Sequence, residues 1–355
     1  MFCMDEKIQQ RYDAFWENDV CDRFLTYMSI GGERPARPDG MDDAAFAEYK
    51  WGNLEARAQN AYESALRKRY YLDGFSTEFV NFGPGSLAAY VGGDYAYALD
   101  TVWFDRNPII KDWSRRPSIE FDSESDLWKQ TVAYTDRLLN NRNSYVSIAD
   151  IGGTLDVLAS LRGTEDLLFD LYDHPEEVKA ASEDIRRAWK KAYTLLADRT
   201  LAHQDGTTSW MPIWCRQRYA PLQCDFSAML SPDMFKEFVL PDLVELTEFL
   251  EKSIYHLDGP GEIPHVDHLL TIPRLNAIQW TSGAGNCDVT DPCWFEMYDK
   301  IQAAGKGLVL FVERADQLEP LLHHLSPRGV FLSVYPKDDY DAKKISEMIE
   351  RIGVR

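Results

Sequence analysis

Short apolar runs that end on polar or aromatic residues recur along the chain, and segments with helical spacing separate most of them. The runs are rich in β-branched and aromatic residues, which favours strands. We predict eight strands, at Glu78–Phe82, Tyr145–Asp150, Thr207–Ile213, Gln223–Ala228, Ser253–Asp258, Asn276–Trp280, Gly307–Glu313 and Gly329–Tyr335. Strands that alternate with helices pair in parallel through right-handed crossovers.

The clearest helical pattern runs from Ser231 to Lys252, with apolar residues along one face. Ser231 can cap the first free amides, Pro232 suits the first turn, and Pro241 should kink the helix. Further helices are predicted from Asp173 to Asp198 or beyond, over Glu262–Leu270, over Gln317–Leu325 with Asp316 as N-cap, and within the amphipathic region Asp42–Tyr71.

Eight strand and helix units are the number that closes a (β/α)₈ barrel. An open doubly wound sheet is the competing architecture, but no G-x-G-x-x-G turn follows the first strand, which disfavours its dinucleotide-binding form. We therefore predict an α/β fold, a (β/α)₈ TIM barrel over residues 73–355. A helical extension over residues 1–72 should pack on the barrel, and the irregular stretch Gly31–Met41 should be a loop.

Composition narrows the function classes. The chain has 355 residues and a formal net charge of −20, which argues against nucleic-acid and anionic-membrane partners. Six cysteines without C-x-x-C spacing argue against a zinc-finger module and a small disulfide scaffold. No apolar run of about eighteen residues occurs, and Met1–Gln10 carries charges where a signal peptide needs apolar residues. We expect a cytoplasmic enzyme with reduced thiols and a small-molecule substrate.

Barrel enzymes carry their reactive residues at the C-terminal ends of the strands. His256 and Asp258 end the fifth predicted strand, and residues two apart point the same way, so both should enter one space. We predict His256, Asp258 and Glu313 as catalytic residues. The predicted substrate-binding residues at the other strand ends are Asn81, Asp150, Trp210, Trp214, Asp225, Gln279, Trp280 and Tyr335.

Each of these residues also has a structural interpretation. A single aspartate at a strand end is often an N-cap, a tryptophan is often part of the core, and His256 could be a hydrogen-bonded structural histidine. The Gly259-Pro260-Gly261 turn behind His256 favours an active-site role, because glycine lets a ligand approach the backbone closely.

Three stretches resemble the uroporphyrinogen decarboxylase superfamily. They are the run from Asp225 to Pro241 with its Ser-Pro-x-x-Phe-x-x-Phe-x-x-Pro pattern, His256-Leu257-Asp258-Gly259, and Ile301–Lys306. Asp150-Ile151-Gly152-Gly153 with Leu155-Asp156, and the helix start Asp173–Val178, are also similar to that superfamily, and Asn81–Pro84 is a looser match. The resemblance covers roughly Tyr145 to the C-terminus. It implies a (β/α)₈ barrel and either cofactor-free decarboxylation or methyl transfer with a corrinoid protein.

Two departures separate this chain from those activities in their best-known forms. The decarboxylase carries an Arg-Gln-Ala-Gly-Arg motif near its N-terminus, whereas Met1–Ile30 has only isolated arginines, so uroporphyrinogen is not the expected substrate. The zinc methyltransferases carry His-x-Cys after strand five and a cysteine after strand eight. Here Asp258 replaces the first cysteine, and Phe331–Pro336 contains no cysteine. No bound metal is therefore expected, although His256 and Asp258 with Glu313 or Cys287 would be the ligands of one.

Three functions remain open. The first is a methyltransferase that moves a methyl group between a small methylated substrate, a folate or a thiol and a corrinoid protein, with Glu313 or His256 as acid. Trp210, Trp214 and Trp280 could then cage an ammonium ion or stack on a pterin. No tightly bound cofactor is expected; a corrinoid on a partner protein or tetrahydrofolate would be the co-substrate, and a homodimer is compatible with the sequence.

The second function is a metal-independent decarboxylase or lyase on a small carboxylate or sugar-like substrate. That reaction needs a cation in the pocket, for which Arg216, Arg218 and Lys306 are the candidates. The third is a non-catalytic binding barrel, whose mouth the Gly31–Met41 loop or bulky side chains would fill.

Overall fold

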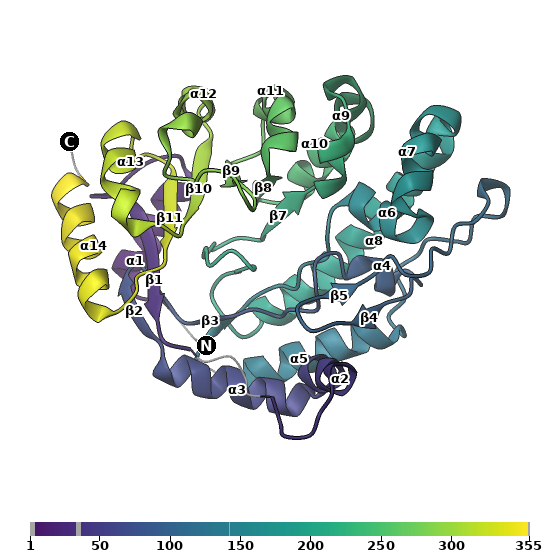
Figure 1. The fold of residues 1–355 in the computed structure, drawn as a ribbon, viewed down its shortest axis with the longest axis horizontal. Coiled ribbons are helices and arrows are strands. Elements are labelled where there is room, and N and C mark those ends of the chain that lie inside the picture. The colour runs from purple at the N-terminus through teal and green to yellow at the C-terminus, as the bar shows by residue number, and fades with distance from the viewer. Residues whose placement is uncertain (1–3, 33–36, 142, 354–355) are drawn as a thin grey trace.

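A computed structural model describes residues 4–32, 37–141 and 143–353. Within these residues, fourteen α-helices surround a curved and mostly parallel sheet (Figure 1). The helices are α1 Glu6–Trp16, α2 Asp43–Gly52, α3 Leu54–Arg67, α4 Leu87–Tyr90, α5 Asp126–Asn141, α6 Thr154–Arg162, α7 Thr164–Asp173, α8 Pro175–Leu201, α9 Pro232–Phe238, α10 Leu240–Phe249, α11 Val266–Leu270, α12 Phe295–Ala303, α13 Leu318–His324 and α14 Asp339–Ile352. Short 3₁₀ helices are η1 Trp113–Arg115, η2 Asp225–Met229, η3 Pro260–His265, η4 Pro292–Trp294 and η5 Ala315–Gln317.

The main sheet has seven strands in the order β2-β1-β11-β10-β9-β8-β7. All neighbours are parallel except β2, which is antiparallel to β1 at one edge. The strands are β1 Leu25–Ile30, β2 Arg69–Leu72, β7 Tyr219–Gln223, β8 Lys252–Asp258, β9 Ala277–Thr281, β10 Gly307–Val312 and β11 Val330–Val334. Two small sheets pair β3 Thr77–Glu78 with β6 Tyr145–Val146, and β4 Ala96–Tyr97 with β5 Val102–Trp103.

The last four predicted strands are confirmed as β8, β9, β10 and β11, each within a residue or two of its predicted bounds. Their apolar side chains are buried almost without exception, as expected for parallel strands covered on both faces. Figure 1 shows α10, α11, α12 and α13 following the outer side of this part of the sheet.

Two of the strands predicted earlier in the chain are not strands in the structure. The strand predicted at Gln223–Ala228 is wrong, because β7 ends at Gln223 and Asp225–Met229 is the 3₁₀ helix η2. Pro221 lies inside β7, which is tolerated because β7 is an edge strand of its sheet. The segment Thr207–Ile213 is not a strand either: Thr207 forms one antiparallel bridge to Cys215, so the chain reverses between them.

A closed barrel is not confirmed, since the described sheet stays open between β7 and β2. On the open side, β3 and β6 contain only two paired residues each. Single backbone hydrogen bonds continue the curve there, from Ser147 to Glu78 and from Ile148 to Thr208. The regular pairing of these two strands stops at Glu78 and Val146.

The predicted helix from Ser231 to Lys252 is confirmed with a break. Ser231 accepts a hydrogen bond from the Met234 amide and caps α9, and α10 begins at Leu240 just before Pro241. The helix after Asp173 is confirmed as α8. The helix at Gln317–Leu325 is confirmed as α13, but Asp316 belongs to η5 rather than capping it.

The first 72 residues contain strands as well as helices. β1 pairs with β11 in the main sheet, and β2 pairs with β1, so this part of the chain is not purely helical. The predicted loop Gly31–Met41 includes residues 33–36, which lie outside the described residues. No helix in the described ranges combines the length and apolar character that crossing a membrane requires.

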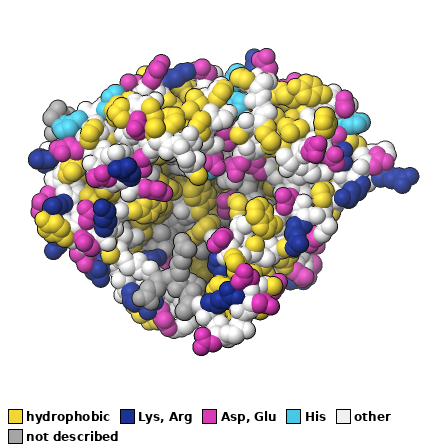
Figure 2. All heavy atoms as spheres, viewed as in Figure 1, with side chains coloured by type: hydrophobic (Ala, Val, Ile, Leu, Met, Phe, Trp, Pro, Cys, Tyr) yellow, Lys and Arg dark blue, Asp and Glu magenta, His cyan; other side chains and the backbone are white. Residues whose placement is uncertain are grey.

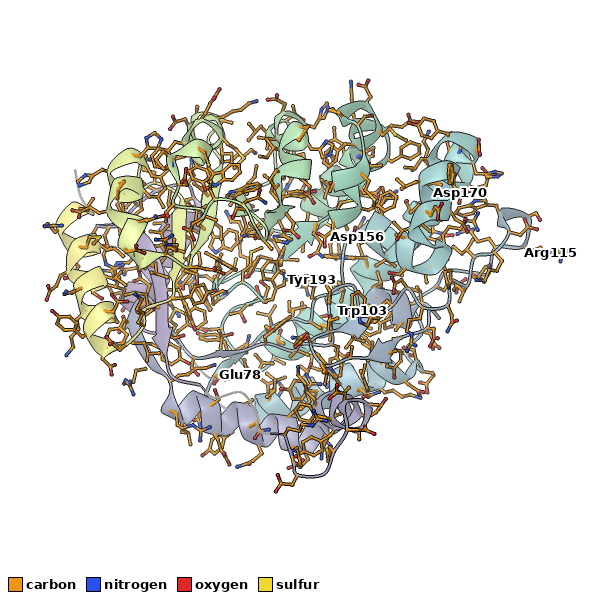
Figure 3. All side chains as sticks on the ribbon, viewed as in Figure 1. Glu78, Trp103, Arg115, Asp156, Asp170 and Tyr193 are labelled. Carbon is orange, nitrogen blue, oxygen red and sulfur yellow. The ribbon has the colours of Figure 1, made fainter. Side chains whose placement is uncertain are left out.

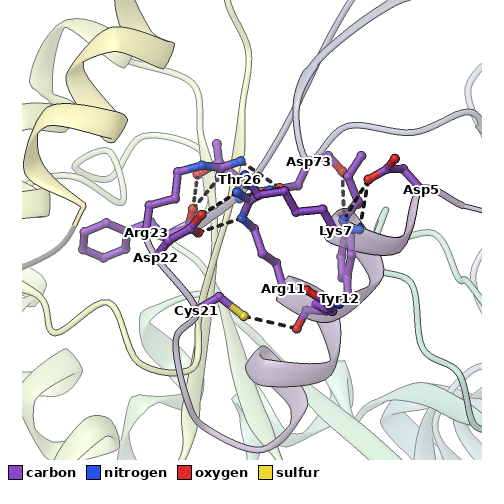
Figure 4. Close-up of polar contacts among 12 residues, drawn as sticks. Asp5, Lys7, Arg11, Tyr12, Cys21, Asp22, Arg23, Thr26 and Asp73 are labelled. Atoms are coloured by element: carbon purple, nitrogen blue, oxygen red, sulfur yellow. Dashed lines mark hydrogen bonds and ion pairs between the residues drawn. The ribbon is translucent and has the colours of Figure 1, made fainter.

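A buried ion cluster ties α1 to β1 and to the turn after β2 (Figure 4). Asp73 is fully buried, and its carboxylate accepts hydrogen bonds from Arg11 at 3.1 Å and from Arg23 at 2.5 and 2.8 Å. The Thr26 amide donates to the same carboxylate at 2.9 Å. Since Trp16 of α1 also donates to the Trp214 carbonyl oxygen at 2.9 Å, α1 is held across the N-terminal ends of the strands.

Candidate active site

His256 and Asp258 lie at the C-terminal end of β8, between β7 and β9. His256 is level with Gln223 of β7 and Gln279 of β9, and Asp258 is level with Thr281. Tyr255 and Leu257, which alternate with them, are fully buried. The strand period of two therefore sends His256 and Asp258 to the same side, as predicted, and His256 Nε2 lies 4.0 Å from Asp258 Oδ2.

The hydrogen bonds around His256 fix its tautomer. The Gln279 side-chain nitrogen donates to Thr281 Oγ1 at 2.8 Å, so the Gln279 carbonyl oxygen faces His256 Nδ1 as an acceptor. Nδ1 therefore donates to Gln279, and Nε2 is the ring nitrogen that faces Asp258. The Trp210 ring meets the imidazole edge-on, with 5.1 Å between the ring centres, and limits its movement.

Five carboxyl groups gather around this end of β7 and β8. They are Asp150, Asp156, Asp225, Asp258 and Glu262, named the carboxylate cluster below. Asp150 follows β6, Asp156 lies in the first turn of α6, Asp225 begins η2, and Glu262 lies in η3. Segments far apart in the sequence thus bring their carboxylates to one place, as expected where the C-terminal ends of parallel strands meet.

Burial and repulsion between the carboxylates raise the pKa values of this cluster. Burial, together with the Asp225 charge, raises the pKa of Asp156 to about 7 and that of Asp150 to about 6. The same two causes raise the pKa of Glu262 to about 9, and burial raises the pKa of Asp225 itself. Glu262 is therefore protonated at neutral pH, and Asp156 is poised between its acid and its carboxylate.

The backbone packs closely against the Asp156 side chain. Its Oδ1 accepts a hydrogen bond from the Phe226 amide at 2.8 Å, which joins α6 to η2. Asp156 Oδ2 is buried and has no protein partner. A Cβ on Gly153 would lie 2.0 Å from the Gln223 carbonyl oxygen and 2.6 Å from Asp156 Oδ2, so only glycine fits there.

Asp156 and Asp225 line a cavity of about 330 Å³, named the acidic cavity below. Its other walls include Trp103, Phe104, Phe226 and Met229, and among the described residues no lysine or arginine lines it. Figure 3 labels Asp156 and Trp103 near the middle of the view, and Figure 2 shows this face hollowed there with acidic side chains close to the hollow. A small ligand that is neutral or positively charged suits such a space, whereas an anion is repelled.

Several predicted site residues lie elsewhere. Glu313 and Tyr335 line a separate cavity of about 740 Å³ behind the glycine-rich loop 282–286, named the glycine-loop cavity below. Asn81 lines a third cavity of about 300 Å³ beside Arg57 of α3. Trp214 is fully buried among the residues that pack on α1, and Trp280 is fully buried against Trp294. The predicted cage of three tryptophans is therefore wrong, and only Trp210 contacts His256.

The three cations required for a lyase lie at the opposite end of the strands. Arg216 and Arg218 precede β7 and pair with Asp13 and Asp198, respectively. Lys306 precedes β10, and its Nζ donates to the backbone oxygens of Ile272 and Leu275. None of the three can bind a substrate carboxylate at the carboxylate cluster.

Comparison with known proteins gives a similarity of fold. No protein-family model and no curated protein matches the chain. The fold is similar to that of a methyltransferase from Methanosarcina mazei, with a TM-score of 0.62 over 97% of this chain and 98% of that one. The two sequences are 10% identical, so the similarity is one of fold.

The metal ligands of a thiol-activating zinc site are not reproduced at His256. The third group beside His256 and Asp258 is Asp225, with the three ligand atoms within 4.8 Å of one another, rather than Glu313 or Cys287. An imidazole and two carboxylates offer only nitrogen and oxygen ligands, so this group lacks the thiolates of a thiol-activating zinc site.

Two residues of the site were missed in the sequence. Asp156 resembles an ordinary acidic residue in a first helical turn, and Glu262 resembles a surface residue of a short helix. The double glycine before Asp156 and the glycines on both sides of Pro260 are the local signals of tight packing at these positions.

Proposed function

We propose that this protein is a methyltransferase that removes a methyl group from a small, uncharged O-methyl compound bound in the acidic cavity. The observation that carries the proposal is the Asp156 carboxyl group, whose buried Oδ2 has no hydrogen-bond partner and which lines a small aromatic-walled space at the C-terminal ends of the strands. Burial there raises the pKa of Asp156 to about 7. The fold shared with a methyltransferase supports the reaction class.

The chemistry explains why an acid is needed. When a methyl–oxygen bond breaks, its electron pair stays on the oxygen, and an unprotonated alkoxide is a poor leaving group. A methylated amine already carries its own positive charge at neutral pH and needs no such donor. A half-protonated carboxyl therefore fits an ether donor better, and the cluster's negative charge excludes anionic donors.

The residues of this chain bind the donor and move the proton. Trp103, Phe104 and Phe226 supply apolar contacts to the methyl donor. Asp156 Oδ2 transfers its proton to the oxygen atom from which the methyl group leaves. Asp225 and Asp150 keep the Asp156 proton in place by repulsion until the bond breaks. His256 Nε2, which faces Asp258, can take up a proton from water and pass it to the cluster afterwards. A corrinoid on a partner protein would supply the electron pair that accepts the methyl group, and tetrahydrofolate is the alternative acceptor.

Single-turnover methyl transfer tests the proposal. The full chain would be mixed with a reduced corrinoid protein and, in turn, with small methyl ethers, quaternary methylamines and methoxy-substituted carboxylates. We expect methylation of the corrinoid, followed by its absorbance, with neutral methyl ethers only. A preference for methoxy-carboxylates, or no transfer from any donor to any corrinoid or folate acceptor, would contradict the proposal.

A further inference from the structure

Two free cysteines and an aspartate meet in the loop between β9 and α12. The ligand atoms of Cys287, Asp291 and Cys293 all lie within 4.8 Å of one another, and both cysteines are unpaired thiols. Two sulfur atoms and a carboxylate oxygen at one point form a ligand set that favours zinc over magnesium or calcium. This group is separate from the one formed by Asp225, His256 and Asp258.

Hydrogen bonds brace the loop that carries these three residues. The Thr290 amide and hydroxyl donate to Asp288 Oδ1 at 3.0 and 2.7 Å. The Trp294 indole donates to the Asp288 carbonyl oxygen at 3.1 Å, and the buried Tyr298 hydroxyl donates to the Val289 carbonyl oxygen at 2.7 Å. The loop is therefore held in shape by its own contacts before any ion binds.

A hydrogen bond also orients the Asp291 side chain. Its Oδ1 accepts a hydrogen bond from the Cys293 amide at 2.9 Å, which fixes the carboxylate at the start of η4. Such outer contacts to a ligating group hold it in position and are common around metal sites. The two thiols also lie within hydrogen-bonding reach of this carboxylate, so the three ligand groups already converge.

Two residues of this ligand group also line a cavity that is large enough for a small ligand. Cys287 and Asp291 line the glycine-loop cavity, together with Glu313, Arg314 and Tyr335. Structural zinc sites have four protein ligands, whereas catalytic sites have three and keep a fourth position open. Three ligands at the wall of a cavity of about 740 Å³ correspond to the second arrangement.

We propose that Cys287, Asp291 and Cys293 bind a zinc ion whose fourth position faces the glycine-loop cavity. That position would take a water molecule or an electron-pair donor atom of a ligand held in the cavity.

Cobalt substitution tests this site directly. The full chain would be stripped of metal with a chelator under reducing conditions and titrated with Co²⁺, whose bonds to thiolates give an intense near-ultraviolet absorption band. We expect that band to saturate with the first equivalent of Co²⁺ and to disappear when Zn²⁺ is added. The Cys287→Ser and Cys293→Ser variants should each weaken Zn²⁺ binding by about 100-fold or more, because each loses a direct ligand.

Two controls make the outcome specific. Cys21→Ser removes an exposed thiol whose Sγ donates to the Gln10 carbonyl oxygen, outside this loop, and should leave the band unchanged. Asp225→Asn should leave it unchanged too, because that residue belongs to the other candidate ligand group. Circular dichroism would confirm that each variant is folded. Absence of a thiolate band in the folded wild type, or a band that survives both serine substitutions, would overturn the proposal.

Discussion

Replacement of Asp156 by asparagine should lower the rate of methyl transfer by about 100- to 10,000-fold, the range typical for loss of a general acid. Asparagine has the same shape and can still accept the hydrogen bond from the Phe226 amide, but it has no proton to give at neutral pH. The measurement is the single-turnover rate of the variant against the wild type at saturating donor.

The rate of methyl transfer should also depend on pH, in a direction that the pKa of Asp156 sets. Burial raises the pKa of Asp156 to about 7, so the acid form is present below that pH and the wild-type rate should fall as pH rises through about 7. Stability follows the same direction: a carboxyl group with a raised folded pKa stabilises the fold at low pH and loses that contribution as pH rises through its folded pKa. Asp156→Asn should therefore be at least as stable as the wild type at pH 8.

A surface variant controls for charge. Asp173→Asn removes one negative charge from the exposed end of α7 and should change neither the rate nor its pH profile. If Asp156→Asn transfers methyl groups at the wild-type rate while folded, Asp156 is not the acid.

Replacement of Asp73 by asparagine should lower the free energy of unfolding by about 3–5 kcal/mol. Asp73 is fully buried and is the shared partner of Arg11 and Arg23, whose side chains are only 9% and 8% exposed. Asparagine would leave the buried Arg23 guanidinium group without its counter-charge and would remove one of the two carboxylates that Arg11 shares, the other being Asp22. The measurement is urea unfolding at pH 7, followed by tryptophan fluorescence.

The matched control for Asp73 lies on the same helix as Arg11. Asp13→Asn removes the exposed pair between Asp13 and Arg216, whose side chains are 43% and 54% exposed, and should cost no more than about 1 kcal/mol. Equal losses for the two variants would mean that the Asp73 cluster does not anchor α1.

The part of the fold that could be predicted is the part with continuous apolar strands. β8 to β11 are buried on both faces, so their β-branched runs are long enough to detect. β3 and β6 pair over two residues, and β7 contains Pro221, so their signals are short or misleading. β1 was missed although it pairs with both β11 and β2 in the main sheet.

Some residues of the candidate site could likewise be predicted from the sequence, and others could not. The period of two placed His256 beside Asp258, and the rule that reactive groups follow strand ends placed Asp150, Asp225 and Gln279 nearby. That rule could not tell which strand ends share a cavity, so Glu313 and Tyr335 fell at another one. The pKa of Asp156 depends on burial and on Asp225, neither of which can be read from its neighbours in sequence.

The central claim is that the Asp156 carboxyl group keeps its proton near neutral pH. Carbon-13 NMR of the chain labelled at aspartate side-chain carboxyls would follow its titration without any substrate or partner. We predict one resonance with a midpoint near pH 7 that is missing from Asp156→Asn. If the resonance that Asp156→Asn removes titrates below about pH 5 in the folded wild type, the ordinary range for this residue, the claim is wrong.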